Sequence, residues 1–277
     1  MIVVIGGRGR LGRTLLHAFE GAASALDRPT YETWWREESI ADIRRLLTSS
    51  SPEITSVVVA SGVLDPGADA QEHFRVNVLL PKNIIVALQD TGISVVTVGT
   101  VMESLIAHKN NYIASKLQLA DIVASQAALG APVMHIRLHT LYGGGVPSRF
   151  MFLGQMAQAL ASDKPFAMTS GEQLREYHHM KDAAHGIRAL MDAKGWGIND
   201  LSFGNPVKLR LLAESVFDAF DKRHLLSIGA LNRPTEENYG TTFTKNDRIA
   251  HLHFRKPVDG VVQYMKTCVP QLRLGTN

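Results

Sequence analysis

The segment MIVVIGGRGRLG constrains the fold of this chain more than any other feature of its sequence. Residues 2–6 form a continuous apolar run, which is typical of a strand buried on both faces of a parallel sheet. Residues 10–22 then carry leucine and phenylalanine at helical spacing. Between the two runs lie four closely spaced glycines, Gly6, Gly7, Gly9 and Gly12. We therefore predict a strand, a tight glycine turn and a helix, in that order.

The glycine spacing fits G-x-G-x-x-G over residues 7–12 and G-x-x-G-x-x-G over residues 6–12. Glycine permits the tight turn, lets the backbone approach a phosphate and allows the helix to pack closely on the strand. The helix N-terminus then offers free N–H groups to a pyrophosphate. This context predicts dinucleotide binding, with a glycine turn that binds no ligand as the alternative. The candidate cofactor residues of the loop are Gly6, Gly7, Arg8, Gly9, Arg10, Leu11 and Gly12.

The residues after the predicted second strand bear on which dinucleotide binds. Asp27 lies 20 residues after Gly7, where an acidic residue commonly holds the adenosine ribose of NAD. Arg28 follows it directly, and Arg8 and Arg10 lie within the loop. Guanidinium groups suit the 2′-phosphate of NADP in both charge and geometry. We therefore favour NADP, keep NAD as the alternative, and include Asp27 and Arg28 among the candidate cofactor contacts.

Short β-rich runs alternate with helical stretches along the first half of the chain. Strands are predicted at 2–6, 24–27, 30–35, 55–61, 93–99 and 133–138, and helices at 10–22, 38–47, 74–89 and 111–127. This alternation predicts βαβ units with right-handed crossovers, and hence an α/β fold with a Rossmann-type doubly wound parallel sheet. We expect a dinucleotide-binding domain of residues 1–142 plus about 177–205. A smaller C-terminal α/β substrate domain would take about 143–176 plus 206–277.

Composition excludes several other classes of function. The 277 residues carry a net charge of +3 and contain no run of five Lys or Arg, so nothing favours nucleic-acid binding. No apolar run reaches the roughly 18 residues of a membrane span, and we identify no signal peptide. The single cysteine, Cys268, fits a reducing compartment, and we expect a cytoplasmic protein. The histidines lack metal-ligand spacing, so no metal site is predicted.

Tyr112 and Lys116 lie at positions i and i+4 of a predicted helix and therefore share one face. A free tyrosine has a pKa of about 10, too high for easy proton exchange at neutral pH. A nearby ammonium and an oxidised nicotinamide ring would both lower that pKa, which makes the phenol a usable general acid or base. Thr100 ends the strand before this helix, and its hydroxyl can hold a carbonyl oxygen beside the phenol. A surface helix pair of little energetic value is the alternative.

Together, several segments resemble the short-chain dehydrogenase/reductases, specifically the extended branch of nucleotide-sugar epimerases, dehydratases and 4-ketoreductases. They occur in the family's order from residue 1 to about 190, and the last 70 residues match only loosely through FRKPVDGVVQYM. The matching segments are GGRGRLG, VVVASG, RVNVLLPKNIIVAL, VGT followed by YIASK, IRLHTLYGGG and TSGEQLREYHHMKDAAHGI.

The resemblance implies roles for particular residues. Tyr112 would exchange a proton with the substrate oxygen, Lys116 would bind the nicotinamide ribose, and Thr100 would orient the keto or hydroxyl group. Arg175 would contact the nucleotide diphosphate, with a structural ion pair to Asp182 as the alternative. The further cofactor-binding candidates are Ala60, Ser61, Gly62, Asn77 and Leu138, and the further substrate-binding candidates are Met102, His139 and Thr140.

Members of this branch reduce, epimerise or dehydrate their substrates. Dehydratases carry Asp-Glu directly after the catalytic threonine, whereas Val101 and Met102 follow Thr100 here, which disfavours dehydration. The arginine-rich loop favours exchangeable NADPH, so the resemblance implies reduction of a nucleotide-linked 4-keto-6-deoxy sugar. A nucleotide-sugar epimerase with recycled NAD is the first alternative, and a non-catalytic NADP-binding regulator is the second. Related proteins often pair, which makes a homodimer the expected assembly.

Overall fold

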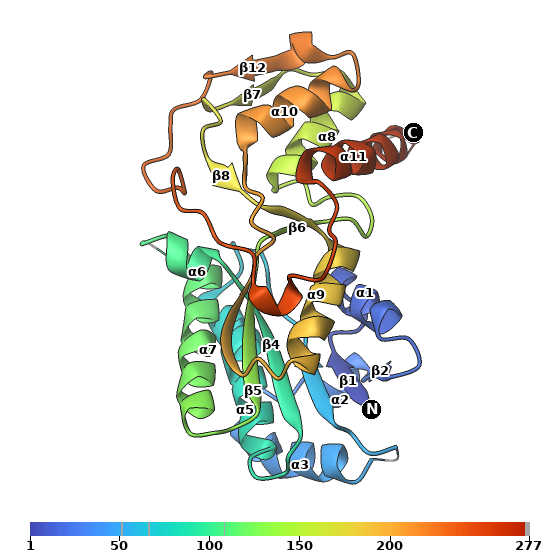
Figure 1. Cartoon of the computed structure of the whole chain (residues 1–277), viewed down its shortest axis with the longest axis vertical. Helices are drawn as coiled ribbons and strands as arrows, with labels where there is room; N and C mark the ends of the chain where they lie inside the picture. Colours follow the sequence, from blue (N-terminus) through green and yellow to red (C-terminus); the bar gives the residue numbers. More distant parts are fainter. Residues whose placement is uncertain (51, 66, 108, 275–277) are drawn as a thin grey trace. The chain divides into compact units, whose positions relative to one another are not determined.

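The computed structural model describes residues 1–50, 52–65, 67–107 and 109–274. Contacts between residues divide the chain into two compact units, coloured along the sequence in Figure 1. The first unit comprises Met1–Leu138, Ala184–Leu201 and Asp247–Ala250, and the second comprises His139–Ala183, Ser202–Asn246 and His251–Asn277.

A parallel sheet forms the centre of the first unit (Figure 1). In the described part of the chain its six strands run in the order β10-β5-β4-β3-β1-β2, and every neighbouring pair is parallel. The strands are β1 (Ile2–Ile5), β2 (Ala23–Ala25), β3 (Ser56–Val59), β4 (Ser94–Thr100), β5 (Val133–Leu138) and β10 (Gly197–Leu201). This arrangement confirms the predicted doubly wound α/β fold.

Helices cover both faces of this sheet. They are α1 (Arg10–Ala18), α2 (Arg28–Tyr31), α3 (Ile40–Thr48), α4 (Ala70–Phe74), α5 (Leu80–Ala87), α6 (Met102–Leu105), α7 (Asn111–Ala128) and α9 (Met180–Asp192). Alternate strand residues such as Val3 and Val57 pack into one core with residues of α3, α5 and α7. On α9, the Arg188 guanidinium lies 5.5 Å from the centre of the Phe19 ring, which follows α1. The strands are buried on both sides, as their continuous apolar runs predict.

The predicted strand at residues 30–35 is wrong, because this segment starts as helix α2 and continues as a turn. Pro29 lies in the first helical turn, where its fixed φ favours a helix. Tyr31 and Trp34 are both buried, and their ring centroids lie 6.4 Å apart. The amide of Asn83 on α5 donates to the carbonyl of Trp34 at 2.9 Å, which holds the turn against the sheet's helical layer.

The helix predicted at residues 74–89 is built from three segments. Helix α4 leads into a π-helical turn, η2 (Arg75–Leu79), and α5 follows. Pro81 lies in the first turn of α5. A proline there lacks the N–H for an α-helical bond and its ring crowds the carbonyl four residues earlier, so the wider π turn relieves the conflict.

The second unit contains small sheets and a helical layer. Its paired strands are β6 (Thr140–Tyr142) with β9 (Tyr177–His179), β7 (Phe166–Met168) with β12 (Leu226–Ile228), and β8 (Leu174–Arg175) with β11 (Val207–Lys208). Its helices are α8 (Phe152–Ser162), α10 (Leu209–Asp218) and α11 (Pro257–Leu274), which share one apolar core. In the residues that the structure describes, no helix has the length and apolar character needed to cross a membrane.

The unit boundary differs from the division expected from the sequence. Residues 139–142, 177–183 and 202–205, expected in the dinucleotide-binding domain, lie in the second unit, and residues 247–250, expected in the substrate domain, lie in the first. For the first two segments the reason is that β6 and β9 pair with each other and form a separate sheet instead of extending the central one.

Candidate active site

The glycine turn lies where the backbones of β1, of α1 and of the segment after β3 approach one another closely. Gly6 has φ +87°, and a Cβ built on it would lie 2.5 Å from the backbone nitrogen of Ser61. A Cβ on Gly12 would lie 2.2 Å from the carbonyl oxygen of Gly6. Helix α1 begins at Arg10, and its N-cap, Gly9, provides no side chain to bind the free N–H groups of the first turn. These groups remain available to an anion at the end of the sheet.

The turn lies at the switch point of the sheet, where the chain leaves β1 for β2 on one side and later β3 on the other. In open α/β sheets this crevice at the carboxyl ends of the strands is where ligands bind. Ala60, Ser61 and Gly62 follow β3 at the same edge. A Cβ on Gly62 would lie 3.4 Å from the Lys116 Nζ, so this glycine faces the lysine predicted to be catalytic.

Asn77 in the π turn fastens the loop after β3. Its side-chain oxygen accepts from the Val63 N–H at 2.9 Å, and its amide donates to the Val63 carbonyl at 3.0 Å. The same amide donates to the Ser115 hydroxyl at 3.0 Å and contacts His73 Nδ1 at 3.2 Å. Asn77 therefore shapes the loop beside the glycine turn.

His73 was not singled out from the sequence, yet it lies next to the predicted catalytic tyrosine. It is almost fully buried, its Nε2 lies 3.0 Å from the Asp65 carbonyl oxygen, and its ring centre is 6.3 Å from that of Tyr112. A lone histidine in an acidic and polar stretch carries no sequence signal for this placement.

Thr100, Tyr112 and Lys116 all belong to the first unit. Thr100 ends β4, while the other two lie in the first turns of α7, where Asn110 caps the helix by accepting from the Ile113 N–H at 2.9 Å. Lys116 is buried, and its Nζ donates to the carbonyl of Val98 on β4 at 2.9 Å. Burial lowers the pKa of Lys116 to about 8, although the Glu103 carboxylate acts to raise it.

The expected lowering of the tyrosine pKa is wrong for the protein without cofactor. Burial, reinforced by the negative charge of Glu103, raises the pKa of Tyr112 well above its ordinary value. The Lys116 ammonium donates to Val98 and does not form a hydrogen bond with the phenol in the described structure. Tyr112 is therefore protonated throughout the neutral range, as a proton donor must be.

The end of β5 supports this group through the backbone. Leu138, a predicted cofactor contact, is buried, and its carbonyl accepts from the Val101 N–H at 3.0 Å. Met102, a predicted substrate contact, is partly exposed, and its N–H donates to the Thr100 hydroxyl at 3.3 Å. That hydroxyl oxygen therefore points toward the start of α6.

The arginines of the glycine loop lie on the surface of the first unit. Arg8 Nη2 donates to the Asp27 carboxylate at 2.9 Å, and both side chains are largely exposed. Arg10 and Arg28 are also exposed. Asp27, the acidic residue predicted to bind the adenosine ribose, is thus already paired with the Arg8 guanidinium.

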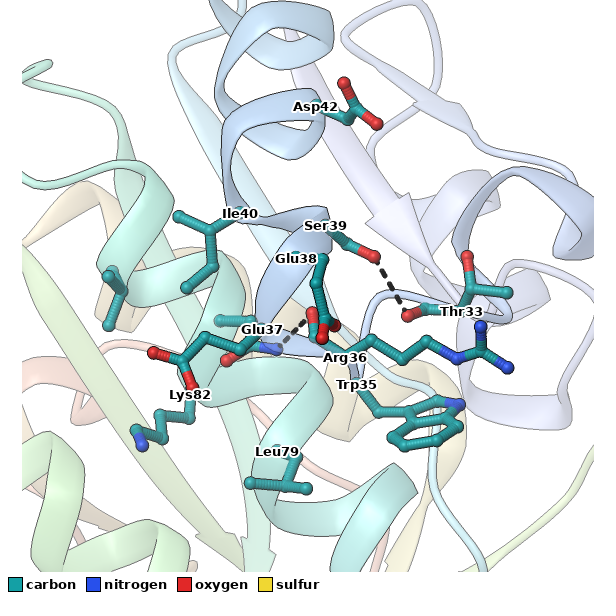
Figure 2. Close-up of a pocket in the computed structure, with 12 residues that line it drawn as sticks. Thr33, Trp35, Arg36, Glu37, Glu38, Ser39, Ile40, Asp42, Leu79 and Lys82 are labelled. Atoms are coloured by element: carbon teal, nitrogen blue, oxygen red, sulfur yellow. Dashed lines mark hydrogen bonds between the residues drawn. The ribbon is translucent and has the colours of Figure 1, made fainter.

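A pocket of about 800 Å³ in the first unit contains none of the residues predicted for the site (Figure 2). Its lining comes from the segment before α3, from α3 itself and from η2 and α5, and includes Trp35, Glu37 and Lys82. The Ser39 hydroxyl donates to the Thr33 carbonyl at its rim, 3.1 Å away. This hollow lies outside the glycine turn and has no part in the candidate site.

In the second unit, Arg175 forms an ion pair with Glu237. The alternative pairing with Asp182 is wrong, because that carboxylate binds Arg255 instead. Arg175 lies on β8, while Asp182 lies in the first turn of α9. The Arg175 side chain is 15% exposed, so an incoming anion would meet a guanidinium already held by one carboxylate.

His139 lies beside a buried carboxylate, Glu176, and the Thr140 N–H donates to the backbone carbonyl of Glu176 at 3.2 Å. This carboxylate accepts from His178 Nε2 at 2.9 Å, from the Ser202 hydroxyl at 2.7 Å and from a backbone N–H. Burial alone would raise the pKa of Glu176, but these hydrogen bonds outweigh it and lower the pKa. His139 Nε2 lies 3.9 Å from the carboxylate and has no hydrogen-bond partner in the described structure.

Acid is expected to destabilise the protein through His139. Burial lowers the pKa of His139 to about 4 from 6.5, so its contribution to stability is complete above pH 6.5 and is lost as pH falls to about 4. A shift of that size corresponds to about 3 kcal/mol. Urea unfolding at pH 7 and pH 4.5 measures the loss, which His139→Asn should reduce. The exposed His224→Asn control should lose as much as wild type, and equal losses in all three proteins would contradict the assignment.

The sequence from residue 2 to residue 199 identifies the family. Residues 2–199 match the model of the NAD dependent epimerase/dehydratase family, which is well over half of the chain. The chain belongs to this family. It is therefore an NAD(P)-dependent enzyme of the extended short-chain dehydrogenase/reductase class, as the motifs predict. The matched span contains every candidate cofactor residue and the Thr100, Tyr112 and Lys116 group.

Solved structures of extended family members share the fold of this epimerase/dehydratase family protein. A UDP-glucuronic acid 4-epimerase from Bacillus cereus aligns with a TM-score of 0.77 at 16% identity, covering 98% of this chain and 99% of its own. A dTDP-4-dehydrorhamnose reductase from Bacillus anthracis aligns with a TM-score of 0.74 at 15% identity, covering 96% and 98%. RMD from Pseudomonas aeruginosa, complexed with NADPH, gives 0.73 at 17%, covering 96% and 99%. A comparison with curated protein sequences gives no match.

The residues of this family member fit a dinucleotide. The backbone around Gly6 and Gly12 leaves no room for a Cβ, so the loop can approach a pyrophosphate closely. Beyond it, Gly62 opens toward the Lys116 ammonium, which is the donor that a ribose hydroxyl requires. Asn77 and the end of β3 complete the edge along which the cofactor would lie.

Proposed function

We propose that this protein is an NADPH-dependent reductase of a nucleotide-linked 4-keto-6-deoxy sugar. The observation that carries the proposal is the group of Thr100, Tyr112 and Lys116 beside the glycine turn, because a phenol in this group can give a proton to the carbonyl oxygen of a ketone.

The mechanism assigns one role to each of three side chains. Tyr112 donates its proton to the substrate oxygen as the carbonyl becomes an alcohol. The Thr100 hydroxyl donates a hydrogen bond to the same oxygen and keeps it beside the phenol. The Lys116 ammonium would hold the nicotinamide ribose, because it is buried near Gly62 and directed by the Val98 carbonyl. The cofactor, when bound, supplies the hydride.

The choice of NADPH rests on the arginines around β2. Arg8 already neutralises Asp27, which weakens the repulsion that a free carboxylate would exert on a 2′-phosphate. Arg10, at the start of α1, and Arg28, at the start of α2, are both exposed. A phosphate can recruit such guanidinium groups through charge-assisted hydrogen bonds.

Dehydration is disfavoured by the place of the nearest carboxylate. Glu103 follows Val101 and Met102, and its side chain is fully buried and bonded to a backbone N–H and to His135. A dehydratase needs an acid and a base that reach the substrate, and this carboxylate faces the protein interior.

Arg175 and His139 in the second unit would contribute to binding the nucleotide sugar.

The decisive experiment measures cofactor consumption with nucleoside-diphosphate 4-keto-6-deoxy sugars. The thymidine diphosphate sugar is the first substrate to try, because the neighbouring structures include dTDP-4-dehydrorhamnose reductases. We expect one NADPH oxidised per sugar reduced, with a higher kcat/KM for NADPH than for NADH. Product formation without net cofactor oxidation would instead identify an epimerase. A protein that binds NADPH and turns over no sugar of the panel would contradict the proposal and favour a regulator.

Two further expectations rest on the sequence alone. The homodimer and the cytoplasmic location stay predictions, which size-exclusion chromatography with light scattering and cell fractionation would test. The proposed chemistry requires neither a dimer nor a particular compartment, because Thr100, Tyr112 and Lys116 all belong to the first unit of one chain.

A further inference from the structure

A buried carboxylate lies directly behind the proposed catalytic threonine. The Glu103 side chain has no exposed surface, although it follows Thr100 by only three residues. Its Oε1 accepts from the Thr100 N–H at 2.6 Å. The motif of the threonine, tyrosine and lysine does not require an acidic residue at this position.

An imidazole holds this carboxylate from the other side. His135 Nε2 lies 3.2 Å from Glu103 Oε2, and its Nδ1 lies 2.8 Å from the Thr97 hydroxyl. His135 and Thr97 are fully buried and face each other in the register of β5 and β4. The chain of contacts therefore runs from the Thr100 backbone through the carboxylate and the ring to the centre of the sheet.

Gly99 has no side chain and leaves room for the Glu103 carboxylate and the His135 ring. A Cβ on Gly99 would lie 2.1 Å from His135 Nε2 and 2.3 Å from Glu103 Oε1. Any other residue at this position would displace the carboxylate or the ring. Gly99 thus belongs to the same arrangement as Glu103 and His135.

We propose that Glu103 is a positioning residue for the reduction, whose carboxylate, held by His135, fixes the Thr100 backbone and so aims the threonine hydroxyl at the substrate carbonyl. The inference rests on the proposed function, because it assigns Thr100 to the carbonyl oxygen. It goes further by explaining why an acid, an imidazole and a glycine occur together beside that threonine.

The charge of Glu103 also reaches the two titrating groups of the site. It acts to raise the pKa of Lys116 and adds to the raised pKa of Tyr112. The other charged or titratable groups of the described structure that act on this cluster are Arg137 on β5, which acts on His135, and His73, whose ring faces the phenol. Removing the carboxylate charge should therefore lower the pKa of both Tyr112 and Lys116.

Two variants separate position from charge. Glu103→Gln keeps an oxygen for the Thr100 N–H, and its amide can donate to His135 Nε2 once the ring carries its proton on Nδ1, toward Thr97. Glu103→Ala leaves the Thr100 N–H and the ring without a partner. Glu20→Gln, at an exposed site, is the control for removal of a negative charge.

We expect Glu103→Gln to keep kcat at pH 7 within about threefold and Glu103→Ala to lose about tenfold or more, since an unpaired buried N–H is costly. In Glu103→Gln the alkaline limb of the kcat/KM profile should move down by about half a unit to one unit, because Lys116, whose pKa is about 8, loses its proton earlier without the carboxylate charge. Glu20→Gln should match wild type in both. Wild-type kcat in Glu103→Ala, or an unmoved alkaline limb in Glu103→Gln, would overturn the inference.

Two measurements without substrate keep this test independent of the proposed reaction. Hydrogen exchange at the Thr100 amide should stay slow in Glu103→Gln and become fast in Glu103→Ala. The ¹³Cε resonance of Lys116, assigned by its absence in Lys116→Arg, should titrate at lower pH in Glu103→Gln than in wild type. If both hold while no sugar is reduced, the proposed function fails and the positioning by Glu103 stands. If neither holds in an active reductase, only the inference about Glu103 fails.

Discussion

Replacing Tyr112 by phenylalanine is expected to lower kcat for sugar reduction about a thousandfold, the effect of losing a general acid at a carbonyl oxygen. The phenol is the only group of the three that donates a proton, and its raised pKa keeps that proton available across the neutral range. Affinity for NADPH should change little, because the lysine and the glycine turn remain. Steady-state NADPH oxidation measures kcat, and quenching of protein fluorescence measures cofactor affinity.

Tyr142→Phe provides the matched control for the loss of a hydroxyl. Tyr142 is buried, and its hydroxyl has no hydrogen-bond partner in the structure described here. Removing that hydroxyl should leave kcat within about twofold of wild type, because no buried partner loses its bond. A Tyr112→Phe protein that kept a tenth or more of the wild-type kcat would contradict the role of the phenol as the proton donor.

Gly6→Ala is expected to abolish useful NADPH binding, with at least about a hundredfold loss of affinity, and to destabilise the first unit by about 3 kcal/mol. Two effects add. A φ of +87° strains any residue with a Cβ, and that Cβ would lie 2.5 Å from the Ser61 backbone nitrogen. Relief requires the end of β1 to move away from the end of β3, which opens the turn that would cradle the pyrophosphate. Isothermal titration and urea unfolding measure the two losses.

Gly21→Ala separates the strain of the backbone from the collision. Gly21 has φ +76°, close to that of Gly6, but a Cβ there meets nothing within 4 Å. This variant should lose about 1 kcal/mol of stability and keep wild-type affinity for NADPH. Equal effects of the two substitutions on NADPH affinity would show that the close approach at Gly6 plays no part in binding.

Much of the first unit could be predicted because its signals are local. A buried parallel strand must be apolar throughout, so residues 2–6 and 55–61 could be identified directly. The strand prediction for residues 30–35 is wrong because a segment rich in threonine and aromatic residues suits a strand equally well. Pro29, and a side-chain amide 49 positions away at Asn83, decide for a helix and turn, and the second of these is a tertiary contact.

The predicted site shows the same limit. The glycines and the tyrosine–lysine pair obey fixed spacings, so their positions could be read from the sequence. Glu103 and His135 are separated by 32 residues and meet only because β4 and β5 are neighbours. The direction of the Tyr112 pKa also depends on burial and on that carboxylate, which spacing on one helix does not reveal. Where the partner comes from another strand, the fold has to be known first.

The π turn at residues 75–79 makes one stretch of the chain intolerant of any change in length. Each residue added to or removed from an α-helix rotates the remainder of that helix by about 100°. The stretch from Asp69 to Ala87 must aim Asn77 at the loop after β3 and, seven residues on, bury Ile84 against the sheet. An insertion or deletion between these two residues would disrupt either the contacts of Asn77 with the loop after β3 or the packing of Ile84 in the core. Substitutions can therefore change the side chains of this segment, but its number of residues is fixed, because Asn77 and Ile84 must both keep their contacts.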